Sequence, residues 1–240
     1  MSSYSSLSFS YDEFTGDVNY SAYADLYQRI FKEKNINVET ALDLCCGTGT
    51  LSSIMAGRGI DIVAVDGSSD MLSKAYSKYY DKGIQFVCQR AEELDLFGTV
   101  DAAWSSLDSF NYFSQASFKL VIEKLRLFIR PGGILIFDIR PEEFLRSLDG
   151  QIFVDESDDK LCLWRAELKQ SPERIIYGMD IFTYINGLWR RDQEEHTEYI
   201  HSEAFVRDTL SYYGFEDIDF FIEESDIGAD RLFVSAIRNG

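Results

Sequence analysis

The sequence has few cysteines, and their placement excludes two classes of site. Cys45, Cys46, Cys88 and Cys162 are the four present, and none of them is spaced as C-x-x-C. Zinc sites and disulfide frameworks both depend on paired cysteine spacings, so neither is expected here. A reducing cytoplasm is the simplest setting for such a chain, no metal site is predicted, and the cysteines are expected to pack as small buried hydrophobes.

Basic residues are also scarce. Lys and Arg number 23 against 41 Asp and Glu, which gives a formal net charge of −18 and a pI near 4.4. A surface this negative repels phosphate backbones, so we expect no nucleic-acid partner. It also disfavours an anionic membrane surface.

Long apolar runs are missing as well. No stretch approaches the length of a membrane span, and the opening MSSYSSLSFSYDEF lacks the basic and apolar regions of a secretory signal. Hydrophobic residues nevertheless make up 45% of the 240 residues and aromatic residues 15%, which is ample for a sizeable core. We expect a cytoplasmic protein of one large domain, with or without a small insertion.

From residue 20 to residue 139, apolar runs alternate with amphipathic stretches. The runs are typical of buried strands and the stretches of helices. Such alternation predicts a parallel sheet with helices on both faces. The expected strands are 40–46, 61–66, 84–89, 100–107 and 134–139, and the expected helices are 20–34, 50–56, one beginning after Ser68 or Ser69, and one with an apolar stripe over 118–129.

Residues 151–200 follow a different pattern, with four strand-like stretches and no helix among them. Asn186-Gly187 is a hairpin signal between two of these stretches. A helix at 203–213 and a hairpin formed by 218–223 and 232–237 then return to the main sheet. We therefore predict an α/β fold with a doubly wound, mostly parallel seven-stranded sheet in residues 1–140 and 201–240. A small antiparallel β insertion, residues 141–200, is expected after the fifth strand.

The sharpest motif is LDLCCGTGT, residues 42–50, where a predicted strand ends in a glycine turn and a helix begins. Ligands of doubly wound sheets bind at such turns. Asp43 lies four residues before Gly47, and Asp66 ends the next strand, where a carboxylate can accept both hydroxyls of a ribose. These residues predict a nucleoside-containing ligand.

A nicotinamide dinucleotide is the competing ligand. Its motif is G-x-G-x-x-G, but Ser52 occupies the third glycine position. Asp43 beside the loop opposes pyrophosphate and favours a cation. S-adenosylmethionine (SAM), with its ribose, adenine and positively charged amino-acid tail, fits better. We expect Asp43 to contact its ammonium, directly or through a neighbouring amide.

Taken together, these motifs resemble the class I SAM-dependent methyltransferases. LDLCCGTGT is similar to their first motif, usually LDLGCGTG, VAVDGSSDML to the second, and LFIRPGGILIFDI to the helix and fifth strand after the catalytic region. WSSLDSFNYF, YDEFTGDVNY and Glu194-x-His196 resemble a bacterial small-molecule-type subgroup with an inserted antiparallel sheet. The resemblance implies a Rossmann-like methyltransferase fold with SAM as its cofactor.

The resemblance also implies contact residues, with Asp66 on the ribose and Met71 near the adenine. Cys45 replaces the usual small glycine, and a small thiol should be tolerated. Arg90 stands where the family has an aspartate that accepts from the adenine amino group, and an arginine cannot accept. Backbone groups at Ala91 and Glu92, or the Glu92 carboxylate, would take over that role. The full expected cofactor set is Tyr20, Asp43, Cys45, Gly47, Thr48, Gly49, Asp66, Gly67, Met71, Arg90, Ala91, Glu92 and Leu107. Tyr11 and Tyr20 are expected either to cover the ligand or to pack in the core.

Two residues are candidates for a catalytic base. Asp108 ends the fourth strand over the expected methyl position, with a solvated loop aspartate as the alternative. His196 fits the subgroup's E-x-H pattern, although its strand face, shared with Glu194 and Glu198, looks solvated. Alternation places Trp189 and Arg191 on the opposite face. Weaker pocket candidates are Ser109, Asn111 and Tyr112, and Asp138 is expected to end the fifth strand, facing solvent.

The predicted reaction is methyl transfer to a small-molecule acceptor by in-line displacement. It needs alignment and sometimes a base, but no metal or covalent nucleophile. The inserted sheet and the N-terminal segment would cover the pocket, and the acceptor atom, nitrogen, oxygen or carbon, stays open. The alternatives are a non-catalytic protein that binds SAM or another adenosine ligand and, more weakly, a nicotinamide oxidoreductase. Either a monomer or a homodimer is expected.

Overall fold

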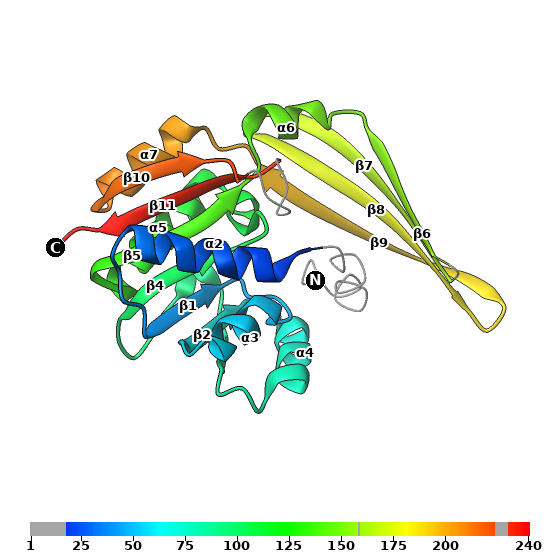
Figure 1. Cartoon of the computed structure of the whole chain (residues 1–240). Coiled ribbons are helices and arrows are strands. Elements are labelled where there is room, and N and C mark those ends of the chain that lie inside the picture. The colour runs from blue at the N-terminus through cyan, green and yellow to red at the C-terminus, as the bar shows by residue number, and fades with distance from the viewer. Residues whose placement is uncertain (1–17, 158, 224–229) are drawn as a thin grey trace.

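A seven-stranded sheet organises most of the chain. The computed structural model describes residues 18–157, 159–223 and 230–240. Strand order in this sheet is β10-β11-β5-β4-β1-β2-β3, and only β11 runs against the others (Figure 1). The predicted doubly wound, mostly parallel sheet is therefore confirmed. Its strands are β1 (Thr40–Leu44), β2 (Asp61–Asp66), β3 (Gln85–Cys88), β4 (Val100–Ser105), β5 (Ile129–Ile139), β10 (Phe215–Phe221) and β11 (Leu232–Arg238).

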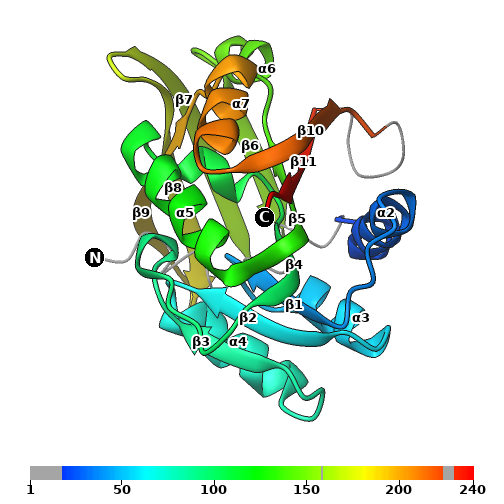
Figure 2. The same cartoon turned by 90° about the vertical axis from the view of Figure 1, so that its left-hand side faces the viewer.

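Helices cover both faces of this sheet because successive strand residues point to opposite sides. On one face, Ala41 and Trp104 pack against α2 (Tyr20–Glu33) and α3 (Thr50–Gly57). On the other, Leu42 and Ala103 pack against α5 (Gln115–Phe128) and α7 (Glu203–Tyr212). Figure 2 shows α5 and α7 on one side and α2 and α3 on the other. The remaining helical pieces are α4 (Ser69–Tyr79), α6 (Glu142–Ser147) and the 3-10 turns η2 (Ala91–Glu93) and η3 (Ser109–Tyr112).

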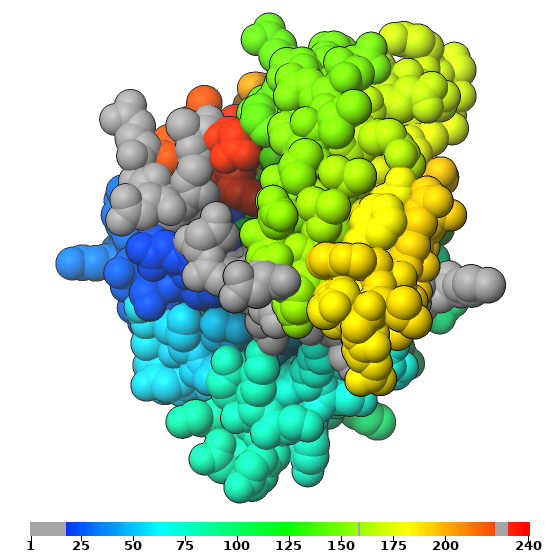
Figure 3. Space-filling view, turned by 90° about the vertical axis from the view of Figure 1, so that its right-hand side faces the viewer, coloured from blue at the N-terminus to red at the C-terminus, as the bar shows by residue number. Residues whose placement is uncertain are grey.

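The second sheet, which we call the arm, is antiparallel and has the order β6-β7-β8-β9. Its strands are β6 (Ile152–Ser157), β7 (Lys160–Gln170), β8 (Glu173–Ile185) and β9 (Leu188–Tyr199). Adjacent strands pair without a register break along their length. The arm leaves the chain after β5 and returns before α7, and it projects from the α/β body (Figure 1). Seen from the right-hand side of Figure 1, the arm lies in front of the body (Figure 3).

The sequence predictions differ from the structure at a few boundaries. β5 begins at Ile129, so Pro131 and Gly132 belong to the strand and do not separate it from α5. The register shift between β4 and β5 lies at this irregular start of the strand. A helix, α6, precedes the arm inside the region predicted as β insertion. No helix in the described part of the chain is long and apolar enough to cross a membrane.

Candidate functional site

The loop between β1 and α3 depends on left-handed backbone. Gly47 has φ +55° and Gly49 has φ +76°. A Cβ on Gly49 would lie 3.1 Å from both Ala75 Cβ and the Phe86 ring, so glycine is required there for space as well as for conformation. Cys45 also has a positive φ, +61°. Its substitution for glycine therefore matters through backbone conformation, and not only through the size of the thiol.

Asp66, at the end of β2, braces this loop. One carboxylate oxygen accepts from the Gly47 amide at 2.9 Å and the other from the Ser68 amide at 2.8 Å. Burial raises the pKa of Asp66, and the two amide bonds oppose that effect. A carboxylate has about four lone-pair sites, so two remain for hydroxyl donors of a ligand.

Asp43 lies at the bottom of the loop, buried. Its Oδ2 accepts from the Ser52 hydroxyl at 2.5 Å. Ser52, the residue that breaks the dinucleotide glycine pattern, thus serves as a partner of Asp43. Burial is the main cause that raises the pKa of Asp43 to about 7, and the Asp66 carboxylate adds to it. An ammonium close to Asp43 would favour its ionised form.

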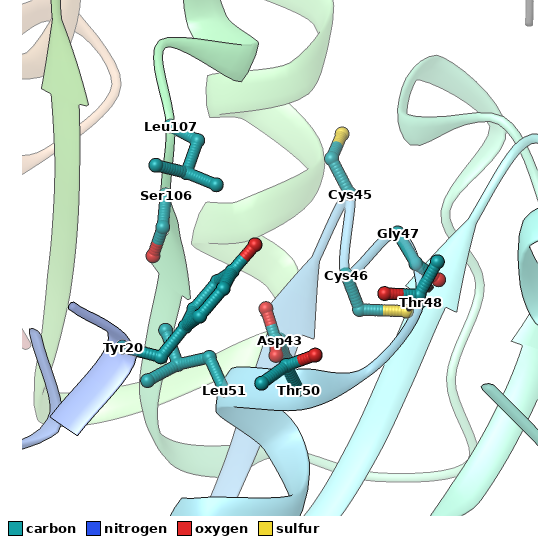
Figure 4. A pocket seen from close by; sticks show the side chains of 10 residues that line it. All are labelled: Tyr20, Asp43, Cys45, Cys46, Gly47, Thr48, Thr50, Leu51, Ser106 and Leu107. Carbon is teal, nitrogen blue, oxygen red and sulfur yellow. Dashed lines mark hydrogen bonds between the residues drawn. The ribbon is translucent and has the colours of Figure 1, made fainter. Parts of the chain in front are cut away.

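A hollow opens beside these residues (Figure 4). It brings together six predicted cofactor residues from α2, from β1 with its glycine loop, and from the loop after β4: Tyr20, Asp43, Cys45, Gly47, Thr48 and Leu107. The Tyr20 hydroxyl points toward the glycine loop in Figure 4. Cys46, Thr50, Leu51 and Ser106 also line the hollow and were not predicted. Cys46 and Thr50 belong to the LDLCCGTGT motif and Leu51 follows it directly, so position in or beside the motif was the available signal.

The other predicted cofactor residues lie outside the lining of this hollow. Met71 is buried in the first turn of α4, which Ser68 caps. Arg90 is exposed and pairs with the Glu92 carboxylate at 3.2 Å, while Ala91 is buried. Asp66 and Cys88 are register partners at the ends of β2 and β3, so the segment after β3 starts beside Asp66. Gly67 lies next to the same segment, since a Cβ there would be 3.9 Å from Arg90 Cα.

The loop after β4 is fixed from beneath by β5. Leu107 and Asp108 both adopt left-handed backbone, with φ +59° and +52°. Asp138 accepts from both of their amides at 2.9 Å, one on each oxygen. Asp138 is fully buried, so the prediction that it faces solvent is wrong. Its carboxylate shapes a loop whose Leu107 borders the hollow.

Two arginines surround Asp108. Arg231 Nη1 donates to Asp108 at 2.5 Å and to Asp138 at 2.7 Å, and Arg140 Nε lies 3.4 Å from the other Asp108 oxygen. These guanidinium groups outweigh burial and lower the pKa of Asp108. Asp108 is buried, so it is not the solvated loop aspartate of the alternative interpretation. A buried carboxylate held by two arginines is a weak base. This geometry does not support the hypothesis that Asp108 acts as the catalytic base.

The two ends of the arm meet the body around Asn111, and we call this junction the neck. The Asn111 side chain accepts from the Arg140 amide and donates to the Tyr199 carbonyl, both at 2.9 Å. Both ends of the insertion are therefore held by one buried side chain on η3, directly after the loop that holds Leu107. Asn111 was predicted as a weaker pocket candidate, and in the structure its side chain bonds to both ends of the arm.

His196 lies on the face of the arm that meets the body. It is 4% exposed, contacts the Tyr112 ring and has its Nε2 3.1 Å from Glu194 Oε2. The expectation of a solvated face is wrong at this end of β9, because Glu198 is also buried. Tyr184 and Trp189 are register partners on the opposite face, and so are Phe182 and Arg191. No bulge brings the two sets together. Tyr11 lies outside the described residues.

Comparisons with known proteins identify the family. A methyltransferase-domain family model matches residues 41–133. The glycine/sarcosine N-methyltransferase of Halorhodospira halochloris is 31% identical over 205 residues, covering 77% of this chain and 74% of that protein. This chain belongs to the class I SAM-dependent methyltransferases.

Two further similarities extend over nearly the whole methyltransferase chain. "Putative methyltransferase YqeM" of Bacillus subtilis (strain 168) is 27% identical over 241 residues, covering 95% of this chain and 94% of that protein. The crystal structure of a SAM-dependent methyltransferase from Clostridium acetobutylicum ATCC 824 superposes with a TM-score of 0.86 at 25% identity, covering 99% of each chain. The predictions of the enzyme class, the fold and SAM as cofactor are confirmed.

Among the described residues of this methyltransferase, no group of three or more His, Cys, Asp or Glu could hold a metal ion. The loop geometry does suit SAM. Asp66 keeps acceptor sites beside a glycine loop that admits close approach, and the buried Asp43 carboxyl suits a cation. Asp43 and Asp66 place two carboxyl groups beside the glycine loop, where a pyrophosphate would need hydrogen-bond donors.

Proposed function

We propose that this methyltransferase transfers the methyl group of SAM to a small-molecule acceptor bound between the hollow and the arm. The observation that carries the proposal is the neck at Asn111. It anchors the arm immediately after the loop of Leu107, and so the buried, polar end of the arm lies next to that loop. The relative from Halorhodospira halochloris is named for two small molecules, glycine and sarcosine, and this supports a small-molecule acceptor.

The residues of the glycine loop would hold the cofactor. Asp66 would accept from the ribose hydroxyls with its remaining lone pairs, and Asp43 would face the amino-acid ammonium. The segment of Arg90, Ala91 and Glu92 would lie along the adenine, together with Met71 and Gly67. When bound, SAM supplies a methyl group that is already activated by the positive sulfonium.

The chain itself must align the acceptor and exclude water. Leu107 and Tyr20 would border the methyl position, because they line the hollow on the side away from the glycine loop. His196 stays a candidate for contact with the acceptor, since it is buried next to η3 on the face of the arm that meets the body, which we call the inner face. The Glu194 carboxylate orients its ring.

The test is turnover with SAM and a panel of small amines, alcohols, thiols and activated carbon acids. Transfer is followed as S-adenosylhomocysteine release and as label in the acceptor. Transfer to at least one panel member is expected. Transfer only to protein or nucleic acid would contradict the proposal. S-adenosylhomocysteine binding without any transfer would contradict it as well.

A further inference from the structure

The inner face of the arm combines carboxylates with aromatic rings. Strand register places Trp164, Tyr177, Glu194, His196 and Glu198 on this face. Trp164 and Tyr177 pack edge to face, with ring centroids 6.5 Å apart. The outer face instead carries Asp180 with Arg165 and Arg191. Carboxylates and aromatic faces are the two side-chain types that bind an organic ammonium.

The Glu198 carboxylate is incompletely bonded within the described part of the chain. It is 4% exposed, and Tyr177 hydrogen-bonds to its carboxylate. Within the described structure its Oε2 has no hydrogen-bond partner, and Arg140 Nε lies 3.9 Å away, beyond hydrogen-bond reach. A buried polar atom without a partner is costly, so an oxygen placed like this one suits a donor brought by a ligand.

The charges around Glu198 also favour a cation. Arg140 is the guanidinium nearest to it, but Arg140 is shared with Asp108 at 3.4 Å and Asp230 at 3.3 Å. Arg231 is likewise shared between Asp108 and Asp138. Four carboxyl groups therefore surround two guanidinium groups, and the excess is acidic. Asp108 immediately follows Leu107, so this cluster borders the loop that lines the hollow.

We infer that the acceptor is an amine, and that Glu198 binds its ammonium and removes the proton before methyl transfer. This inference rests on the proposed function and names its substrate class. The Tyr177 ring, next to Glu198 on the inner face, would contact the same ammonium. The relatives named as N-methyltransferases agree with this class, but the Glu198 site is what assigns it here.

The proposed step balances. The ammonium gives one proton to the Glu198 carboxylate and becomes a neutral amine with a free lone pair. That lone pair forms a bond to the methyl carbon while the carbon–sulfur bond breaks and sulfur keeps the electron pair. The products are a methylated ammonium and S-adenosylhomocysteine, and Glu198 then releases its proton to water.

The titration of Glu198 suits this role. Burial is the main cause that raises its pKa to about 8, and the Asp108 carboxylate adds to it. Arg140, Arg231 and the Tyr177 hydroxyl act in the other direction. A base is most effective when its pKa lies near the working pH.

Glu198→Gln is the decisive variant, with Glu195→Gln as its matched control. Glu195 is exposed on the outer face of the same strand, pairing with Gly178. Calorimetry with S-adenosylhomocysteine comes first, and both variants should bind within about twofold of the parent chain. Glu198→Asp keeps a carboxylate and serves as a second test should the glutamine variant fold poorly.

Acceptors are then assayed in matched pairs that differ only in an amine or a hydroxyl on the same carbon skeleton. We expect transfer to the amine member alone. With that amine, Glu198→Gln should lower kcat/KM by about 100-fold or more and remove the rise of the pH profile near pH 8. Glu198→Asp should retain part of the activity, and Glu195→Gln all of it.

Two outcomes would overturn the inference while leaving the proposed function intact. One is transfer to hydroxyl, thiol or carbon acceptors but not to amines. The other is amine transfer that Glu198→Gln leaves as high as Glu195→Gln does. If no panel member accepted a methyl group, the proposed function itself would be refuted, and the inference with it.

Discussion

Replacing Asp138 by asparagine tests whether one buried carboxylate holds the loop beside the hollow. Three donors converge on its two oxygens: the amides of Leu107 and Asp108, and Arg231 Nη1. An asparagine of the same shape offers one acceptor oxygen and one donor group. Whichever way it turns, its NH2 group faces an N–H hydrogen. The variant therefore leaves at least one of these buried or half-buried amides without an acceptor, and Arg231 loses a charged partner.

The magnitude follows from those two losses. A buried donor without a partner costs about 1–3 kcal/mol, and a hydrogen bond to a charged group contributes about 1.5–3 kcal/mol. We expect Asp138→Asn to lower the free energy of unfolding by about 3–5 kcal/mol, within the range for a broken buried ion pair. For a chain of this length that is a decrease in Tm of roughly 10 °C.

The assay is thermal and urea unfolding, with Asp95→Asn as control because Asp95 is an exposed loop aspartate. S-adenosylhomocysteine affinity should fall together with stability, since Leu107 lines the hollow. A Tm within about 2 °C of the Asp95→Asn control would refute the reasoning. It would mean that the left-handed backbone at Leu107 and Asp108 holds itself without Asp138.

Three further outcomes are expected. Asp66→Ala should weaken S-adenosylhomocysteine binding by on the order of tenfold or more in calorimetry, because it removes a charged acceptor of two hydroxyls; unchanged affinity would exclude the ribose assignment. The pKa values of Asp43 and Glu198, raised to about 7 and about 8, mean that the folded chain keeps these protons when the unfolded chain has lost them. The free energy of unfolding, measured with urea, should thus be lower at pH 9 than at pH 6. Below its pKa, Glu198 contributes a fall of up to about 1.4 kcal/mol per pH unit. Glu198→Gln should make this fall smaller, and an unchanged fall would contradict the raised pKa of Glu198. Replacing residues 151–199 by a short glycine-rich linker should keep S-adenosylhomocysteine affinity within a few fold and abolish methyl transfer; retained transfer would mean that the acceptor does not bind against the arm.

The sequence predicted the parallel sheet well because its signals are local. Each strand of the body is a short apolar run, and the glycine loop carries its conformation in Gly47 and Gly49. The same locality explains why a helix could be predicted to begin after Ser68 or Ser69, and the structure shows that Ser68 caps it. A residue whose role depends on its neighbours in sequence can therefore be assigned from sequence patterns alone.

The cluster of carboxyl and guanidinium groups around Asp108 could not be predicted from the sequence in this way. Arg231 reaches Asp108 and Asp138 only because β11 lies beside β5, and no pattern in the sequence announces that contact. Alternation on β9 placed His196 and Glu198 on one face correctly. It could not tell which end of that face is buried, because burial depends on the body packed against it.

The strand order has a consequence for how the chain folds. Each strand of the arm pairs with the strand next to it in sequence, so the arm needs only hairpin contacts. β5 instead acquires its outer neighbour, β11, from the last residues of the chain. Contacts between distant segments form more slowly than local ones, because loop closure must precede them. During synthesis the strands of the arm can therefore pair before residues 232–238 are available to pair with β5. A chain truncated before those residues would leave this apolar edge of β5 unpaired and open to pairing with other chains.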